Sequence, residues 1–418
     1  MSAKSKLVSD QYIIVFCFVV LLFMLWGVAM TMGDVLNKHF QNVLHISKSS
    51  SGLVQLSIFG AYAVMGIPAG IYMHKFGYKS GILLGLALYA IGAFMFIPAS
   101  NQASFVLFRI ALFILACGLA TLETVAHPLV SALGDEQTSD QRMNLAQAFN
   151  SLGGIIGPLL GSYFLLRGDQ ENTNDLIAIK NLYISIGLLI TTIAFVFSFL
   201  KINIGRATEI SRSTDTYTIT ETDHPENSLF RRKHFVFAVI AQFFNVAAQG
   251  GTWAYFINYG HEVMHFSDAK SANYFALSIF MMMAGRFFGT FIMRYIKPQL
   301  LLAFFAAANV VMCLVVAQAD GWISFGALMM INFFFSIMFP TIFSLGLKDL
   351  GRQKQQASSY LVMGVVGGAI FPPLMGLIAN QNVAQAYYLP IICYLVIITF
   401  ATSYSSAKTN LKPVLRNE

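Results

Sequence analysis

Long apolar stretches recur along the whole chain, and short polar segments separate them. Each stretch is close to the roughly 20 residues that an α-helix needs to cross a bilayer. The pattern predicts twelve membrane-spanning helices, or spans, at residues 12–36, 52–73, 81–98, 104–130, 143–166, 180–200, 235–259, 271–293, 300–318, 322–346, 357–379 and 386–404. The first stretch is too long for the apolar region of a signal peptide, so we expect it to remain as the first helix.

The composition agrees with this pattern. Hydrophobic residues make up 56% of the chain and charged residues only 11%, whereas a soluble domain carries about 25% charged residues. A soluble globular fold is therefore excluded, and we expect an all-α membrane protein embedded in a lipid bilayer. The four cysteines lie inside spans without paired or metal-type spacing, so we expect no metal site.

The formal net charge of +7 is explained by membrane topology. An even number of spans puts both termini on one side of the bilayer. Most Lys and Arg residues of the loops and tails lie on that side, so the positive-inside rule places both termini in the cytoplasm. We expect a multi-pass protein of the inner or plasma membrane, with no nucleic acid among its partners.

One long polar stretch divides the chain into two halves. Residues 201–234 are rich in Thr, Ser and charge, which is typical of a flexible linker. We predict an N-terminal six-helix bundle at 1–200, a cytoplasmic linker at 201–234, and a C-terminal six-helix bundle at 235–418 that ends in a short cytoplasmic tail.

Short motifs recur at equivalent places in the two halves. GIYMHKF at 70–76 and GTFIMRY at 289–295 each place a basic residue five positions after a Gly, followed by an aromatic residue. GGIIGPLLG begins at Gly153 and GGAIFPPLMG at Gly367. Repeats of this kind predict two pseudo-symmetric six-helix bundles.

Two acidic residues lie well within predicted spans, Asp34 in the first and Glu123 in the fourth. A carboxylate inside a bilayer costs roughly 2.5 kcal/mol or more and marks a functional site by default. Desolvation disfavours its charged form, so such a group can exchange a proton. The structural alternative is an ion pair with Arg109 or Arg286. Arg109 cannot reach Glu123, because it lies roughly 21 Å earlier on the same helix.

The layout and several motifs resemble the major facilitator superfamily, and in particular its fucose:proton symporter family of sugar transporters. The resemblance is carried by LETVAHP at 122–128, RMNLAQAFNS at 142–151 and AQFFNVAAQGGTWAYFINY at 241–259, among other stretches. It implies the major facilitator fold, with two six-helix halves that rock about a central site. It also implies a proton-coupling role for Asp34, and both proton and sugar contacts for Glu123.

Polar side chains near Glu123 are candidates for binding a sugar. His127 lies one helical turn after Glu123, so the two share a helix face. We hypothesise that a protonated His127 pairs with Glu123; a histidine bonded to backbone or water is the alternative. In the next span, Gln147 and Asn150 lie three residues apart and could bind sugar hydroxyls. Holding helices together is the alternative role for these amides.

The seventh span offers a second polar and aromatic group. Gln249 and Trp253 lie one turn apart, and Asn258 follows in the same stretch. The resemblance implies that this helix lines the central cavity. Trp26 shares the first span with Asp34, and we expect its ring to contact the substrate as well.

Together these features predict a proton-coupled secondary transporter that imports a monosaccharide by alternating access. Fucose, glucose, galactose or a related hexose remain open as its substrate. The alternatives are a proton-coupled exporter of amphipathic compounds and a sugar sensor that does not transport. No phosphate-binding GxxxxGK[ST] motif is present, so an ATP-driven pump is disfavoured. We expect no enzymatic activity, no cofactor beyond the proton, and a monomer.

Overall fold

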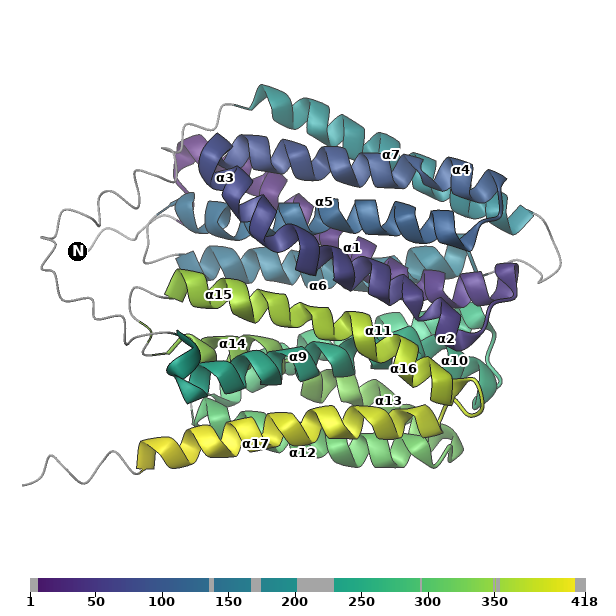
Figure 1. Ribbon diagram of the computed structural model, residues 1–418, viewed down its shortest axis with the longest axis vertical. Coiled ribbons are helices and arrows are strands. Elements are labelled where there is room, and N and C mark those ends of the chain that lie inside the picture. The colour runs from purple at the N-terminus through teal and green to yellow at the C-terminus, as the bar shows by residue number, and fades with distance from the viewer. Residues whose placement is uncertain are drawn as a thin grey trace, which may run out of the picture. The chain divides into compact units, whose positions relative to one another are not determined.

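The computed structural model describes residues 7–134, 139–166, 174–200, 229–293, 295–348, 350 and 354–409 (Figure 1). These residues form helices and contain no strand. The helices are α1 (Ile13–Leu44), α2 (Lys48–Ser51), α3 (Leu53–Phe94), α4 (Phe96–Asn101), α5 (Phe105–Ala132), α6 (Ser139–Phe164), α7 (Asn174–Phe199), α9 (Lys233–Ala254), α10 (Phe256–Glu262), α11 (Asp268–Ile292), α12 (Pro298–Ala317), α13 (Gly321–Phe335), α14 (Met338–Gly346), α15 (Lys354–Met363), α16 (Gly367–Ala379) and α17 (Leu389–Thr409). The predicted all-α class is confirmed. Most of the predicted linker, residues 201–228, lies outside the described residues.

Eleven stretches of the described chain are long and apolar enough to cross a membrane, from Asp10–Leu44 to Gln385–Tyr404. They coincide with eleven of the predicted spans. The remaining predicted span, 143–166, is the 26-residue helix α6, whose polar residues include Gln147 and Asn150. The second and third spans are both part of α3, and they meet at Gly77, where a φ of 83° is accessible to glycine at little cost.

The helix that contains the first predicted span extends beyond the predicted end at residue 36. Helix α1 continues to Leu44, because the polar side chains of its last turns are buried and have partners. Asn37 donates to the Ala254 carbonyl oxygen at 2.9 Å, and Lys38 is only 7% exposed. A hydropathy pattern cannot anticipate such partners, since they come from distant parts of the chain.

Contacts divide the chain into two compact units. Unit 1 consists of Met1–Gly33, Asn42–Leu44 and Gly60–His224, and unit 2 of Asp34–Gln41, His45–Phe59 and Pro225–Glu418. Residues 34–41 of α1, all of α2 and the start of α3 thus pack with helices from the C-terminal part of the chain. The predicted repeat boundaries at 1–200 and 235–418 stay a prediction.

Close helix packing in unit 1 depends on glycine. A β-carbon added to Gly153 of α6 would overlap the Met24 carbonyl oxygen of α1, and one added to Gly157 would overlap Thr31 Oγ1. The backbones therefore approach more closely than any larger residue allows.

Two spans of unit 2 are interrupted. The seventh breaks at Tyr255, between α9 and α10, and the tenth breaks at Ser336 and Ile337, between α13 and α14. Around them, α12 packs along α17, and α9 packs along α16 and α17 (Figure 1). Discontinuous membrane helices of this kind are typical of transporters, where the free backbone groups at the break lie near the binding site.

Candidate functional site

A chain of hydrogen bonds in unit 1 leads to Glu123. The indole nitrogen of Trp26 on α1 donates to the hydroxyl of Tyr62 on α3, and this hydroxyl hydrogen-bonds the carboxylate of Glu123 on α5. Trp26 and Glu123 are partly exposed, while Tyr62 is 5% exposed. Three helices thus fix one carboxylate and leave it accessible.

His127 lies one turn after Glu123 and contacts α6. Its Nε2 is 3.3 Å from Gln147 Nε2, and its ring centroid is 5.2 Å from that of Phe23. An amide nitrogen only donates, so in this contact Nε2 of the His127 ring is the acceptor. The hypothesised pairing of a protonated His127 with Glu123 stays a prediction.

Pro128 affects the backbone at the same place. It lies inside α5 and has no N–H to donate to the carbonyl of Thr124, one turn earlier. The Thr124 carbonyl oxygen therefore lacks its usual helical donor.

Asn150 lies deeper in the packing of unit 1. Its Nδ2 donates to the Phe23 carbonyl oxygen of α1 at 3.1 Å, and the residue is 9% exposed. This bond matches the helix-bonding alternative for the residue. Gln147, three residues earlier, is the more accessible of the two amides.

The other membrane carboxyl group, Asp34, belongs to unit 2. Its Oδ1 accepts a hydrogen bond from Gln55 Nε2 of α3 at 2.6 Å. Asp34 is 3% exposed and Gln55 is 2% exposed. Among the described residues, no cationic side chain lies within ion-pair distance of this carboxyl group. The ion pair considered as a structural alternative for Asp34 is therefore not formed with Arg109 or Arg286.

Trp253 is held from two sides in unit 2. Its Nε1 donates to Asn332 Oδ1 of α13 at 2.8 Å, and Asn332 Nδ2 donates to Ser278 Oγ of α11 at 2.7 Å. The Phe275 ring packs edge-on against the Trp253 ring. Gln249, one turn earlier, is partly exposed, and no described group hydrogen-bonds its amide, which leaves it available to a ligand.

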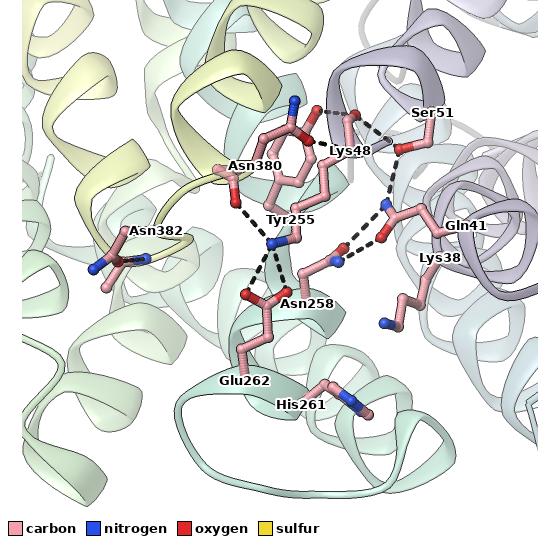
Figure 2. A network of polar contacts seen from close by, with 12 residues as sticks. Lys38, Gln41, Lys48, Ser51, Tyr255, Asn258, His261, Glu262, Asn380 and Asn382 are labelled. Carbon is pink, nitrogen blue, oxygen red and sulfur yellow. Dashed lines mark hydrogen bonds and ion pairs between the residues drawn. The ribbon is translucent and has the colours of Figure 1, made fainter. Parts of the chain in front are cut away.

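Asn258 belongs to a separate set of polar contacts in unit 2, the Lys48 network, formed by Gln41, Lys48, Ser51, Asn258 and Glu262 (Figure 2). Asn258 Nδ2 donates to Gln41 Oε1 at 2.6 Å, and Gln41 Nε2 donates to Ser51 Oγ at 2.8 Å. Lys48 Nζ lies 2.8 Å from Glu262 and donates to the Ala379 carbonyl oxygen at 2.7 Å. The network joins α1 and α2 to α10 and α16.

A second group of charges lies close to this network. Lys38 Nζ is 3.8 Å from Asp268 Oδ1, and His261 Nδ1 is 2.9 Å from the same oxygen. Lys38 and Asp268 are both buried, although both lie outside the predicted spans. The spacing of Asp34, Lys38 and Gln41, three and four residues apart, is the signal that predicts one polar helix face.

Sequence analysis missed Tyr62, Gln55 and Asn332. Gln55 and Tyr62 lie in the second predicted span and Asn332 in the tenth, and a buried polar group inside a span needs a partner. That rule alone marks them as candidates. It does not identify their partners, which lie on other helices. Among the described residues, no group of three or more His, Cys, Asp or Glu could hold a metal ion.

Comparisons with known proteins agree with this architecture. The family model described as Major Facilitator Superfamily matches residues 14–372. The L-fucose-proton symporter of Escherichia coli K12 is 35% identical over 425 residues, covering 96% of this chain and 95% of the relative. The glucose/galactose transporter of Brucella abortus biovar 1 is 35% identical over 379 residues, covering 90% of each.

A solved structure supports the same assignment. The Major Facilitator Superfamily transporter FucP, crystallised in the outward conformation, matches with a TM-score of 0.67 and 34% identity, covering 94% of this chain and 99% of that one. The chain is thus a multi-pass membrane protein that belongs to the Major Facilitator Superfamily.

Proposed function

We propose that the chain is a secondary transporter that imports a monosaccharide together with a proton. The observation that carries this proposal is the hydrogen-bonded series from Trp26 through Tyr62 to Glu123. It places an aromatic face, a hydroxyl and an accessible carboxylate together within one helical unit. A sugar ring has apolar faces and hydroxyl edges, so this combination suits it.

The two carboxyl groups, Glu123 and Asp34, have different roles in this proposal. Glu123 accepts hydrogen bonds from sugar hydroxyls, because its carboxylate is accessible. It also exchanges a proton, because it lies within the membrane and is desolvated. Asp34 is buried with a neutral partner and carries the coupling proton. His127 and Gln147 add sugar contacts near Glu123, with Asn150 behind them.

Unit 2 also carries predicted sugar contacts. The amide of Gln249 and the ring of Trp253 contact the sugar from the seventh span. Asn258 contributes through the Lys48 network, whose opening and closing accompany transport. The names of the relatives favour a hexose as substrate, with L-fucose, glucose and galactose first. We further propose an inner-membrane monomer with both termini in the cytoplasm.

Proteoliposomes containing the purified chain test this function. We expect one sugar of a panel to drive proton uptake and to exchange with its labelled form in counterflow. Asp34→Asn and Glu123→Gln should lose sugar-dependent proton uptake, and Glu123→Gln should also weaken sugar binding. If sugars exchange without moving protons, the coupling is wrong. If no sugar exchanges but an amphipathic compound is exported, the substrate class is wrong, and binding without exchange would indicate a sensor.

A further inference from the structure

Asp34 and Gln55 form an isolated polar pair among the apolar residues of unit 2. The 2.6 Å bond runs from the amide nitrogen to the carboxyl oxygen, and both residues are at least 97% buried. A buried polar group without a partner is costly. The Gln55 amide therefore supplies the hydrogen bond that water would give to an exposed Asp34. Sequence patterns alone assign no role to Gln55.

Titratable groups near this pair in the chain are Lys38 and His39 on α1, Lys48 on α2 and Tyr62 on α3; α10 carries Tyr259, His261 and Glu262, and α11 begins with Asp268 and Lys270 two residues later. Lys38 lies one turn after Asp34 on α1, and its ammonium pairs with Asp268. Lys48 pairs with Glu262. Neither lysine lies within ion-pair distance of Asp34, so burial and the Gln55 amide dominate the balance between its charged and neutral forms.

We propose that Gln55 is the positioning residue for the proton of Asp34, and this rests on the proposed coupling role of that carboxyl group. A glutamine amide has a donor end and an acceptor end. Toward the carboxylate, Nε2 donates, as seen here. Toward the carboxylic acid, the acid O–H donates to Oε1 after a half-turn of the terminal torsion, whose profile is broad and roughly two-fold. The pair keeps a hydrogen bond in both protonation states.

This property suits a group that must load and release a proton in every cycle. A cation at position 55 would stabilise the carboxylate and oppose proton uptake. An apolar side chain there would favour the acid and oppose proton release. The amide holds Asp34 in place without fixing its charge.

The location of the pair connects it to the interrupted seventh span. Asn37, three residues after Asp34, donates to the carbonyl oxygen of Ala254, the residue at which α9 ends. A change of hydrogen bonding at Asp34 therefore occurs one turn from the contact between α1 and the helix break.

Gln55→Met tests the proposal, because methionine keeps the length and bulk of glutamine but neither donates nor accepts strongly. In proteoliposomes we expect sugar counterflow to stay within about threefold of wild type. We expect the pH profile of proton-driven uptake to shift by about one unit toward alkaline pH, since Met removes the bonds of both states and the bond to the charged carboxylate is the stronger of the two. In an Asp34→Asn background, Gln55→Met should produce no further change in pH dependence.

Gln242→Met is the matched control. Gln242 is fully buried, and its amide has no hydrogen-bond partner among the described residues, so this exchange should leave the profile unchanged. An unshifted profile in Gln55→Met, an equal shift in Gln242→Met, or a shift that persists with Asp34→Asn would each overturn the proposal.

Gln55→Glu provides a second variant of nearly identical shape in case Gln55→Met does not fold. Combined with Asp34→Asn, it exchanges the acid and the amide across the same bond. We expect the double variant to regain pH-dependent uptake that Asp34→Asn alone lacks. A double variant that folds and stays independent of pH would contradict the proposal.

Infrared difference spectroscopy separates this inference from the transport function. The carbonyl stretch of protonated Asp34 is identified by its loss in Asp34→Asn, and it should change in frequency and in titration midpoint in Gln55→Met. This readout needs no sugar. If the wild type transports no sugar but the band responds to Gln55→Met, the proposed function fails while the pairing stands.

Discussion

Tyr62 and Glu123 come from different helices, α3 and α5, and share a hydrogen bond at the end of a series that starts at the Trp26 indole. Tyr62→Phe removes the hydroxyl and keeps the ring. We expect kcat/KM for sugar uptake to fall about tenfold or more, because a hydrogen bond to a charged group is lost. Tyr89→Phe, on the same helix and equally buried, is the control and should transport normally. Equal activities of the two variants would remove Tyr62 from the site.

His127→Asn distinguishes the two roles open to this histidine. If a protonated ring pairs with Glu123, the change removes a titrating group, and we expect the pH profile of uptake to change shape between about pH 5 and 8. The measurement is the initial rate of uptake across that range at constant membrane potential. An unchanged profile would mean that the ring acts only as a neutral partner of Gln147, at the 3.3 Å contact seen here.

The ion pair between Lys48 and Glu262 is expected to hold α2 against α10. Lys48→Glu places like charges together, and Lys48→Glu combined with Glu262→Lys restores the attraction in reverse. A disulfide between Ser49→Cys on α2 and Asn380→Cys at the end of α16 reports how closely α2 is held, because Ser49 Oγ and Asn380 Nδ2 lie 3.1 Å apart. The two cysteines are introduced in a background without the native cysteines. We expect the single reversal to slow disulfide formation several-fold and the double reversal to restore it. If the double reversal stays as slow as the single one, the pair does not control the contact.

Gly153→Ala should destabilise unit 1. The added methyl group would overlap the Met24 carbonyl oxygen on α1, and overpacking of this kind costs about 1–3 kcal/mol. The measurement is the thermal unfolding midpoint in detergent. Gly66→Ala is the control, since nothing lies within 4 Å of its added β-carbon. Equal midpoints for the two variants would show that α1 and α6 move apart easily.

Hydropathy predicts the spans well, because unpaired backbone N–H and C=O groups are costly in lipid. A single spanning segment can pair all of them only by forming a helix. It predicts their ends less well. The first helix continues through Asn37, Lys38 and Gln41 only because Ala254, Asp268 and Asn258 supply partners. Such partners depend on the tertiary fold, which local composition does not encode.

The candidate site shows the same limit. Glu123 and His127 could be placed on one helix face from their spacing, since that depends on helix geometry alone. Tyr62 could not be connected to Glu123, because the two are far apart in the chain. Asn258 was expected at the substrate, whereas the structure pairs its amide with Gln41. Spacing predicts which side chains share a face, and only the fold shows what that face meets.

Helix α1 passes from unit 1 to unit 2 between Gly33 and Asp34. A fragment made only of the C-terminal repeat would therefore lack part of its own folding unit. Tyr255 would lose the Lys48 carbonyl oxygen that its hydroxyl contacts at 2.9 Å, and Glu262 would lose its cation. Cutting the chain at the linker would thus separate unit 2 from residues 34–41 and 45–59, which pack within it.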